Sequence, residues 1–178
     1  MLATPSKTVF TEGVAETCSE EASETLVTPG KPVPDFSLPS TGGTTFKLAG
    51  ARGAPLVLYF YPKDNTPGCT QQGSDFRDHH AGFVKAKCAV YGVSRDSLKS
   101  HEGFKAKMKF PFELLSDEDE QVCKLFDVIK LKNMYGRKVR GIVRSTFVVD
   151  EKGVLAREWR GVKVPGHVQE VLSFVKAL

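Results

Sequence analysis

Cys69 stands where the sequence favours chemistry at sulfur. It follows the apolar, aromatic-rich run Leu56–Tyr61, which is typical of a buried strand, and the segment Pro62–Gly68, whose two prolines and glycine end that strand. The stretch Gln71–Lys87 carries apolar residues at helical spacing, so we expect Cys69 in or just before the first turn of a helix. Unpaired N–H groups and the helix dipole favour a thiolate there. The pattern predicts a reactive cysteine, against the alternative of one more small buried hydrophobe.

Pro62, Thr66 and Cys69 form the pattern Pro-x-x-x-Thr-x-x-Cys, which is the active-site signature of the peroxiredoxins. Further matching blocks follow in the same order and at similar spacing, and the similarity runs from about Gly30 to the C-terminus. Together they make the chain resemble the bacterioferritin comigratory protein subfamily, also called peroxiredoxin Q. The blocks are Asp64–Thr70, Phe76–Asp78, Leu115–Glu118 and Gly141–Phe147.

The resemblance implies a thioredoxin-like α/β fold, with a mixed central sheet flanked by helices, and an enzyme without a cofactor. The implied activity is that of a thiol-dependent peroxidase, which reduces hydrogen peroxide and organic hydroperoxides while its cysteine becomes a sulfenic acid. A site for this reaction must raise the thiolate population, align the O–O bond with the sulfur and stabilise charge on the departing oxygen.

The matching motif offers residues for these requirements. Cys69 would be the nucleophile, and the Thr66 hydroxyl could form hydrogen bonds with both the sulfur and the peroxide. Pro62 would shield the sulfur from bulk water. The backbone N–H groups of Gly68 and Cys69, exposed at the start of the helix, would donate to the attacked oxygen.

Arg144 is the candidate for a fixed positive charge. It stands at the start of the predicted strand Val143–Asp150, at the position where the family carries its active-site arginine. A guanidinium keeps its charge at any physiological pH, so it can stabilise both the thiolate and the transition state. Gln72, three residues beyond Cys69, would face the same pocket and orient a neighbour, and a solvent-facing glutamine is the alternative.

The sequence departs from the subfamily where a second thiol would resolve the sulfenic acid. Many members carry a cysteine five residues after the first, where this chain has Ser74, and others carry it on the next helix, here Ser97–Lys109, which has none. We therefore expect a one-cysteine peroxidase that an external thiol recycles, such as glutathione, glutaredoxin or thioredoxin. Two alternatives stay open: a two-cysteine enzyme, and a redox-sensing thiol-transfer protein. In the two-cysteine enzyme the resolving residue would be Cys18, Cys88 or Cys123.

The rest of the chain alternates predicted strands and helices, which indicates an α/β sandwich with a mixed sheet. Val143–Asp150 and Val154–Arg160 read as an antiparallel hairpin, and Pro165 opens a terminal helix that runs to Leu178. The other expected strands are Thr44–Leu48, Cys88–Val93 and Phe112–Leu115; the other helices are Ser97–Lys109 and Asp119–Phe126, with Ile129 on the apolar face of the latter.

Composition and charge restrict the remaining options. The 178 residues, with a formal net charge of +4, suffice for one globular domain, which we place at residues 29–178 after an acidic, disordered tail at residues 1–28. No apolar stretch approaches the ~20 residues of a membrane span and no secretory signal is visible, so we expect a cytoplasmic monomer without membrane contact. No nucleic-acid-reading motif accompanies the basic residues, and no cysteine pair has the short spacing of a zinc site. We therefore expect neither a nucleic-acid partner nor a metal.

Overall fold

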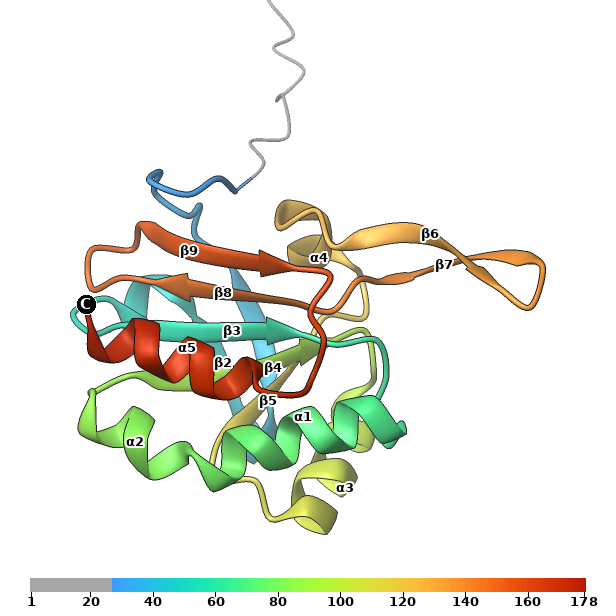
Figure 1. Ribbon diagram of the computed structural model, residues 1–178, viewed down its shortest axis with the longest axis horizontal. Coiled ribbons are helices and arrows are strands. Elements are labelled where there is room, and N and C mark those ends of the chain that lie inside the picture. Colours follow the sequence, from blue (N-terminus) through green and yellow to red (C-terminus); the bar gives the residue numbers. More distant parts are fainter. Residues whose placement is uncertain (1–26) are drawn as a thin grey trace, which may run out of the picture.

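The computed structural model describes residues 27–178, of Met134 only the backbone, and a seven-stranded mixed sheet forms its centre (Figure 1). Strands β3 (Leu56–Phe60), β4 (Ala89–Ser94) and β5 (Glu113–Ser116) are parallel, and the outer strands pair antiparallel. The mixed sheet agrees with the predicted fold class. Its order is β2-β1-β5-β4-β3-β8-β9, completed by β1 (Ser37–Ser40), β2 (Thr44–Lys47), β8 (Ser145–Val149) and β9 (Leu155–Arg160).

Helices cover both faces of this sheet. One core cluster joins it to α1 (Pro67–Asp78), α2 (His80–Lys85), α3 (Leu98–Met108) and α5 (His167–Lys176). A second cluster, on the opposite face, contains residues of the short helix α4 (Gln121–Leu125). Two 3-10 turns, η1 (Thr41–Gly43) and η2 (Leu48–Ala51), flank β2.

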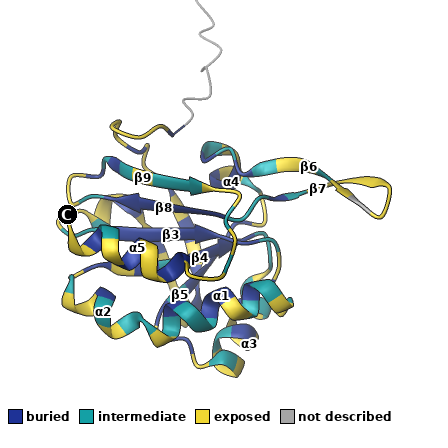
Figure 2. Cartoon of the chain, viewed as in Figure 1, coloured by how far each residue is buried: buried dark blue, intermediate teal, exposed yellow. Residues whose placement is uncertain are grey.

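Strand β3 is buried along its whole length (Figure 2). Its side chains alternate between the two clusters: Val57 and Tyr59 belong to the cluster with α1, and Leu58 and Phe60 to the cluster with α4. Because successive side chains of a strand point to opposite faces, a continuous apolar run suits a central strand covered on both sides. The strand therefore holds the beginning of the Cys69 segment in a rigid position.

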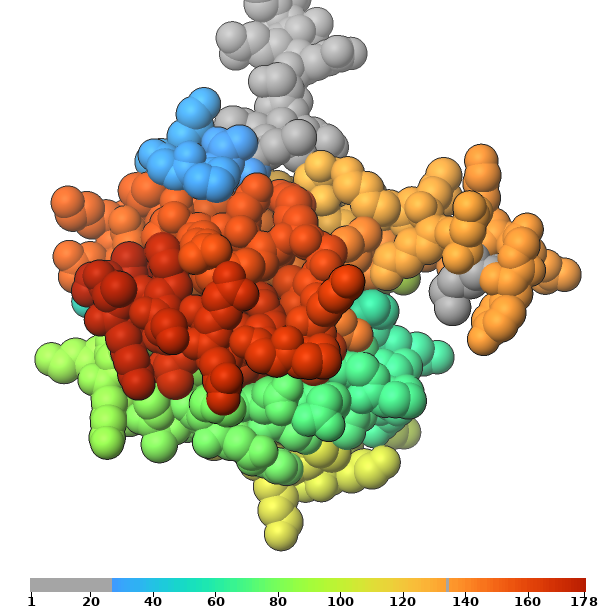
Figure 3. Space-filling model, in the orientation of Figure 1, coloured from blue at the N-terminus to red at the C-terminus, as the bar shows by residue number. Residues whose placement is uncertain are grey.

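A two-stranded hairpin, β6 (Ile129–Met134) and β7 (Arg137–Ile142), projects from the body of the protein (Figures 1 and 3). The residues at its turn, Tyr135 and Gly136, have φ of 51° and 77°, the left-handed conformations that a two-residue type I′ turn requires. The end of β7 leads the chain directly towards Arg144.

The hairpin corrects one prediction from the sequence. Ile129, expected on the apolar face of a helix, is the first residue of β6. Helix α4 ends at Leu125, and Asp127 has a φ of 53°, a left-handed conformation that an α-helix cannot contain. The apolar spacing of the preceding residues therefore predicted helix α4 correctly, but Ile129 does not belong to this helix.

Two helix boundaries were also wrong. The single helix expected over Gln71–Lys87 is two helices that start at Pro67 and are interrupted at His79, which has φ of −98° and ψ of 3°. Pro165 does not open the terminal helix, because Gly166 has a left-handed φ of 75° and α5 begins only at His167. The strand expected from Val143 begins at Ser145, so Arg144 precedes it.

The remaining predicted elements are confirmed with shifts of one or two residues at their ends. The predicted tail lies outside the described residues except for its last two; of these, Val27 is buried and its N–H donates to the carbonyl of Leu125 over 3.3 Å. Among the described residues, no helix has the length and apolar character needed to cross a membrane.

Candidate active site

Cys69 lies in the first turn of α1, as predicted, just after the loop that leaves β3. Thr66 is the N-cap, with extended backbone, and Pro67 occupies the first helical position, where a missing N–H costs nothing. The N–H of Thr70 donates to the carbonyl of Thr66 over 2.8 Å. The N–H groups of Gly68 and Cys69 come before this bond and have no acceptor within the helix. The Cys69 residue itself is only 2% exposed.

Arg144 reaches Cys69 from the segment between β7 and β8, although the two residues are 75 positions apart in sequence. Its Nη2 donates to the Sγ of Cys69 over 3.4 Å, and its Nη1 donates to the Oε1 of Gln72 over 2.6 Å. Gln72 is fully buried, so the solvent-facing alternative is wrong. The guanidinium is thus held by a side chain one turn along the same helix that carries the sulfur.

Gly68 leaves the space that this arrangement needs. A Cβ at this position would lie 3.0 Å from the Nη2 of Arg144, closer than real Cβ atoms normally approach a neighbour. The absence of a side chain therefore lets the guanidinium lie against the start of the helix.

Thr66 and Pro62 lie in the same loop, both half-buried. The Thr66 hydroxyl donates to the carbonyl of Lys63 over 2.9 Å and so closes the turn before the helix. No hydrogen bond between this hydroxyl and the sulfur occurs among the described residues. The predicted contact between Thr66 and Cys69 would require the hydroxyl to rotate away from Lys63.

Two further ionisable groups, Tyr59 and Lys132, interact electrostatically with the charge of Cys69. Burial raises the pKa of Tyr59, and the negative charges of Cys69 and Asp64 raise it further. Lys132, from β6, donates to the carbonyl of Ile142; burial and the nearby Arg144 charge lower its pKa, which the Cys69 charge partly offsets. Sequence analysis missed Lys132 because it missed the hairpin, although the polar and apolar alternation of Ile129–Lys132 was a signal for a strand.

The other described thiols are enclosed in the core. Cys88 is 4% exposed, and burial raises its pKa to about 12. Cys123 is fully buried, and its pKa is raised by burial and by the Asp117 carboxylate. Neither forms a disulfide. Cys18 lies outside the described residues. At position 74, where many members of the subfamily carry a second cysteine, the hydroxyl of Ser74 donates to the carbonyl of Thr70 over 2.9 Å.

Comparison with known proteins identifies the relatives of this chain. A family model described as the AhpC/TSA family matches residues 29–158. Peroxiredoxin Bcp of Xanthomonas campestris pv. campestris is 52% identical over 80% of this chain and 89% of that protein. A solved structure of X. campestris bacterioferritin comigratory protein has a TM-score of 0.76 at 51% identity, over 80% of this chain and 90% of that one. PrxQ of Xylella fastidiosa, solved as a cysteine-to-serine mutant, has a TM-score of 0.81 at 45% identity, over 85% of this chain and 96% of that one.

These comparisons, together with a cysteine at a helix start beneath an arginine, define a thiol peroxidase with a thioredoxin-like fold. The chain belongs to the AhpC/TSA family and, within it, to the peroxiredoxins of the Bcp or PrxQ subfamily. Peroxides as substrates and thiols as reductants follow from this membership.

Proposed function

We propose that Cys69 is the peroxide-attacking residue and that Arg144 stabilises its thiolate. The observation that supports this most strongly is the 3.4 Å contact between Arg144 Nη2 and Cys69 Sγ. The thiolate attacks one oxygen of the peroxide, and the O–O bond breaks. Its electron pair leaves with the other oxygen as hydroxide or alkoxide, which then takes a proton from solvent. Cys69 keeps the transferred oxygen as a sulfenic acid.

The surrounding groups have separate roles in this proposal. The N–H groups of Gly68 and Cys69 donate to the peroxide, and Pro62 limits the access of water. Thr66 reaches the peroxide after releasing Lys63. Gln72 does not touch the substrate and acts through Arg144, which its Oε1 holds at 2.6 Å. The X. campestris relative was studied for alkyl peroxide reduction, so organic hydroperoxides are tested beside hydrogen peroxide.

The proposed recycling uses an external thiol. A thiolate attacks the sulfenic sulfur, water leaves, and a second thiol releases Cys69 from the mixed disulfide. Cys88 and Cys123 are poor alternatives because both are buried and their raised pKa values disfavour the thiolate. Cys18 remains the alternative among the residues that the structure does not describe. Glutathione, glutaredoxin and thioredoxin are the reductants to compare.

Steady-state peroxide consumption tests the nucleophile. We expect Cys69→Ser to abolish turnover with every reductant, because a hydroxyl does not ionise at neutral pH. Cys88→Ser is the matched control and keeps the activity of the parent. Retained activity in Cys69→Ser would falsify the assignment.

Peptide mapping under non-reducing conditions tests the recycling. One equivalent of peroxide should leave a trappable sulfenic acid at Cys69, and excess peroxide should convert it to sulfinic acid. A disulfide from Cys69 to Cys18, Cys88 or Cys123 that forms as fast as the thiol disappears would contradict the one-cysteine mechanism. A single turnover with all three reductants would instead favour a redox sensor.

A further inference from the structure

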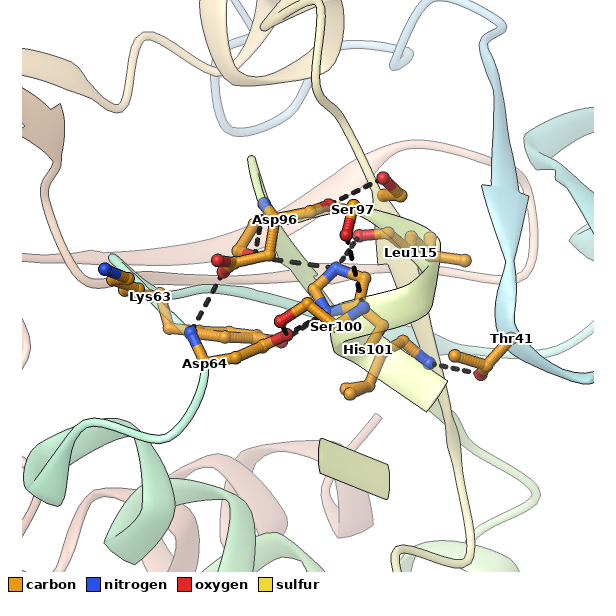
Figure 4. Close-up of polar contacts among 12 residues, drawn as sticks. Thr41, Lys63, Asp64, Asp96, Ser97, Ser100, His101 and Leu115 are labelled. Atoms are coloured by element: carbon orange, nitrogen blue, oxygen red, sulfur yellow. Dashed lines mark hydrogen bonds and ion pairs between the residues drawn. The ribbon is translucent and has the colours of Figure 1, made fainter. Parts of the chain in front are cut away.

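A buried polar network joins the loop between β3 and α1 to helix α3 (Figure 4). At its centre is Asp64, a residue of the active-site motif that is only 4% exposed. Its Oδ1 accepts the hydroxyl of Tyr61 over 2.6 Å, and its Oδ2 accepts the hydroxyl of Ser100 over 2.8 Å. The same Oδ2 accepts the Nδ1–H of His101 over 2.7 Å. These bonds tie the catalytic loop to the first turns of α3.

His101 lies among groups that would stabilise a positively charged ring. The residue is fully buried, and its second nitrogen, Nε2, faces the carbonyl of Leu115 at 3.0 Å. Both ring nitrogens therefore face acceptors, but a neutral imidazole carries only one N–H. The carboxylate is the ionised partner: burial alone would raise the pKa of Asp64, but the hydrogen bonds and charge of His101, with Tyr61 and Ser100, lower it. The buried contact between Asp64 and His101 thus has the geometry of an ion pair.

Asp96 completes the cluster and also explains why it is a hydrogen-bond network and not a cation site. Asp64, Asp96 and His101 are the one group of metal-ligand type that the described residues bring together. The Oδ2 of Asp96 accepts the N–H of Asp64 over 2.9 Å and the hydroxyl of Ser94 over 2.6 Å. Donors thus already occupy both carboxylate oxygens of Asp64 and one of Asp96.

The network reaches the sulfur through backbone and through charge. Asp64 lies midway between Pro62 and Thr66, and Asn65 beside it has a left-handed φ of 61°, so the turn into α1 depends on a fixed anchor. The negative charges of Cys69 and Asp64 both interact with the hydroxyl of Tyr59, because both raise the pKa of Tyr59. Because both charges act on the same Tyr59, an uncompensated Asp64 carboxylate would disfavour a second negative charge on the sulfur.

We propose that His101 is protonated, and that its ion pair with Asp64 is a positioning element of the peroxidase site, which anchors the loop Pro62–Thr66 and offsets the Asp64 charge on the Cys69 side of the sheet. Neither residue touches the peroxide; both act through the loop and the sulfur. The inference rests on the proposed role of Cys69. It adds two residues whose removal changes the reactivity of a sulfur they do not contact.

The test compares His101→Gln with the double variant Asp64→Asn, His101→Gln. The glutamine keeps hydrogen-bond donors but not the charge, so the single variant leaves the carboxylate uncompensated. We expect its second-order rate with hydrogen peroxide to fall about tenfold and the pH at half-maximal alkylation of Cys69 to rise by about one unit. The double variant is neutral and should return the alkylation midpoint to that of the parent.

Ser100→Ala is the matched control, because it removes one bond to Asp64 and keeps the ion pair; its alkylation midpoint should not move. The variants leave unchanged the other ionisable groups that face the pair or the sulfur. These are Tyr59 from β3, Tyr61 directly after β3, Asp96 after β4, Lys132 from β6 and Arg144 before β8.

A folded His101→Gln protein with the rate and midpoint of the parent would overturn the proposal. If the variant does not fold, nitrogen NMR of the parent decides, since a neutral His101 ring at pH 7 also overturns it. Failure of the proposed function looks different: Cys69 of the parent would then not react with peroxide at all, whatever the state of His101.

Discussion

The guanidinium of Arg144 contacts both the sulfur of Cys69 and the amide oxygen of Gln72, so the side chain that supplies the charge is itself held in place. Arginine suits this position because its planar fork carries separate N–H donors for two acceptors. Gln72 lies three residues after Cys69 on the same helix, and side chains at this spacing share a helix face. A single helical turn therefore fixes the distance between the sulfur and the cation.

Removal of this cation should affect both the thiolate and the transition state. We expect Arg144→Ala to raise the activation free energy of the reaction with peroxide by about 2 kcal/mol, which lowers the second-order rate constant roughly 30-fold. The pH at which Cys69 is alkylated at half its maximal rate should also rise. Stopped-flow kinetics and an alkylation pH profile measure the two effects.

Arg140→Ala is the control for Arg144→Ala, because Arg140 is an exposed arginine of β7 that pairs with Glu120. It should react with peroxide as fast as the parent does. If Arg144→Ala also matched the parent in rate and alkylation profile, Arg144 would have no part in the reaction.

At the scale of elements, the sequence correctly predicted that Cys69 lies at the start of a helix, but it missed the β6–β7 hairpin. The Cys69 turn could be located because Pro67 and an apolar strand are strong local signals. Arg144 required the family resemblance, because its contact with Cys69 depends on a long-range fold. The buried contact of His101 with Asp64 could not be predicted, since nothing local distinguishes this residue from a surface histidine on α3. The hairpin was missed because its turn is Tyr-Gly, a weaker signal than Asn-Gly or Asp-Gly.

The close contact between Gly73 of α1 and Phe110 allows a test of whether the exact position of α1 affects stability and the reaction with peroxide. A Cβ at Gly73 would lie 2.4 Å from the Cζ of Phe110, and Phe110 is itself buried in the core. Gly73→Ala should therefore destabilise the protein by about 1–3 kcal/mol despite the better helix propensity of alanine. It should also slow the reaction with peroxide, because α1 carries both Cys69 and Gln72. Urea unfolding and peroxide kinetics measure these effects.

Gly103→Ala provides the comparison on α3. No atom lies within 4 Å of a Cβ placed there, so the same substitution should stabilise the protein by about 0.5–1 kcal/mol. Equal changes in the unfolding free energy of the two variants would show that the contact with Phe110 does not determine the position of α1.

At the scale of the whole molecule, the described thiols differ in their surroundings, and among them Cys69 is the one that an arginine contacts. Cys88 and Cys123 lie in separate core clusters, on opposite faces of the sheet. His167 is also buried, and its Nε2 lies within hydrogen-bond distance, 2.8 Å, of the Thr146 hydroxyl. Burial lowers the pKa of His167 from 6.5 to about 4, and the Arg144 charge adds to this while Glu170 opposes it.

This histidine makes global stability depend on pH. In the unfolded chain His167 takes up a proton below about pH 6.5, whereas the folded protein resists protonation down to about pH 4. The contribution of His167 to the free energy of unfolding should thus be greatest above pH 6.5 and should decrease as the pH falls towards 4. The total loss from this residue is at most about 3 kcal/mol. Asp64, with its lowered pKa, contributes only below this window. Urea unfolding of the parent and of His167→Gln at pH 7.5 and 4.5 isolates the effect. The parent should lose more stability than the variant on acidification, and equal losses would show that His167 is protonated as readily in the fold as in the unfolded chain.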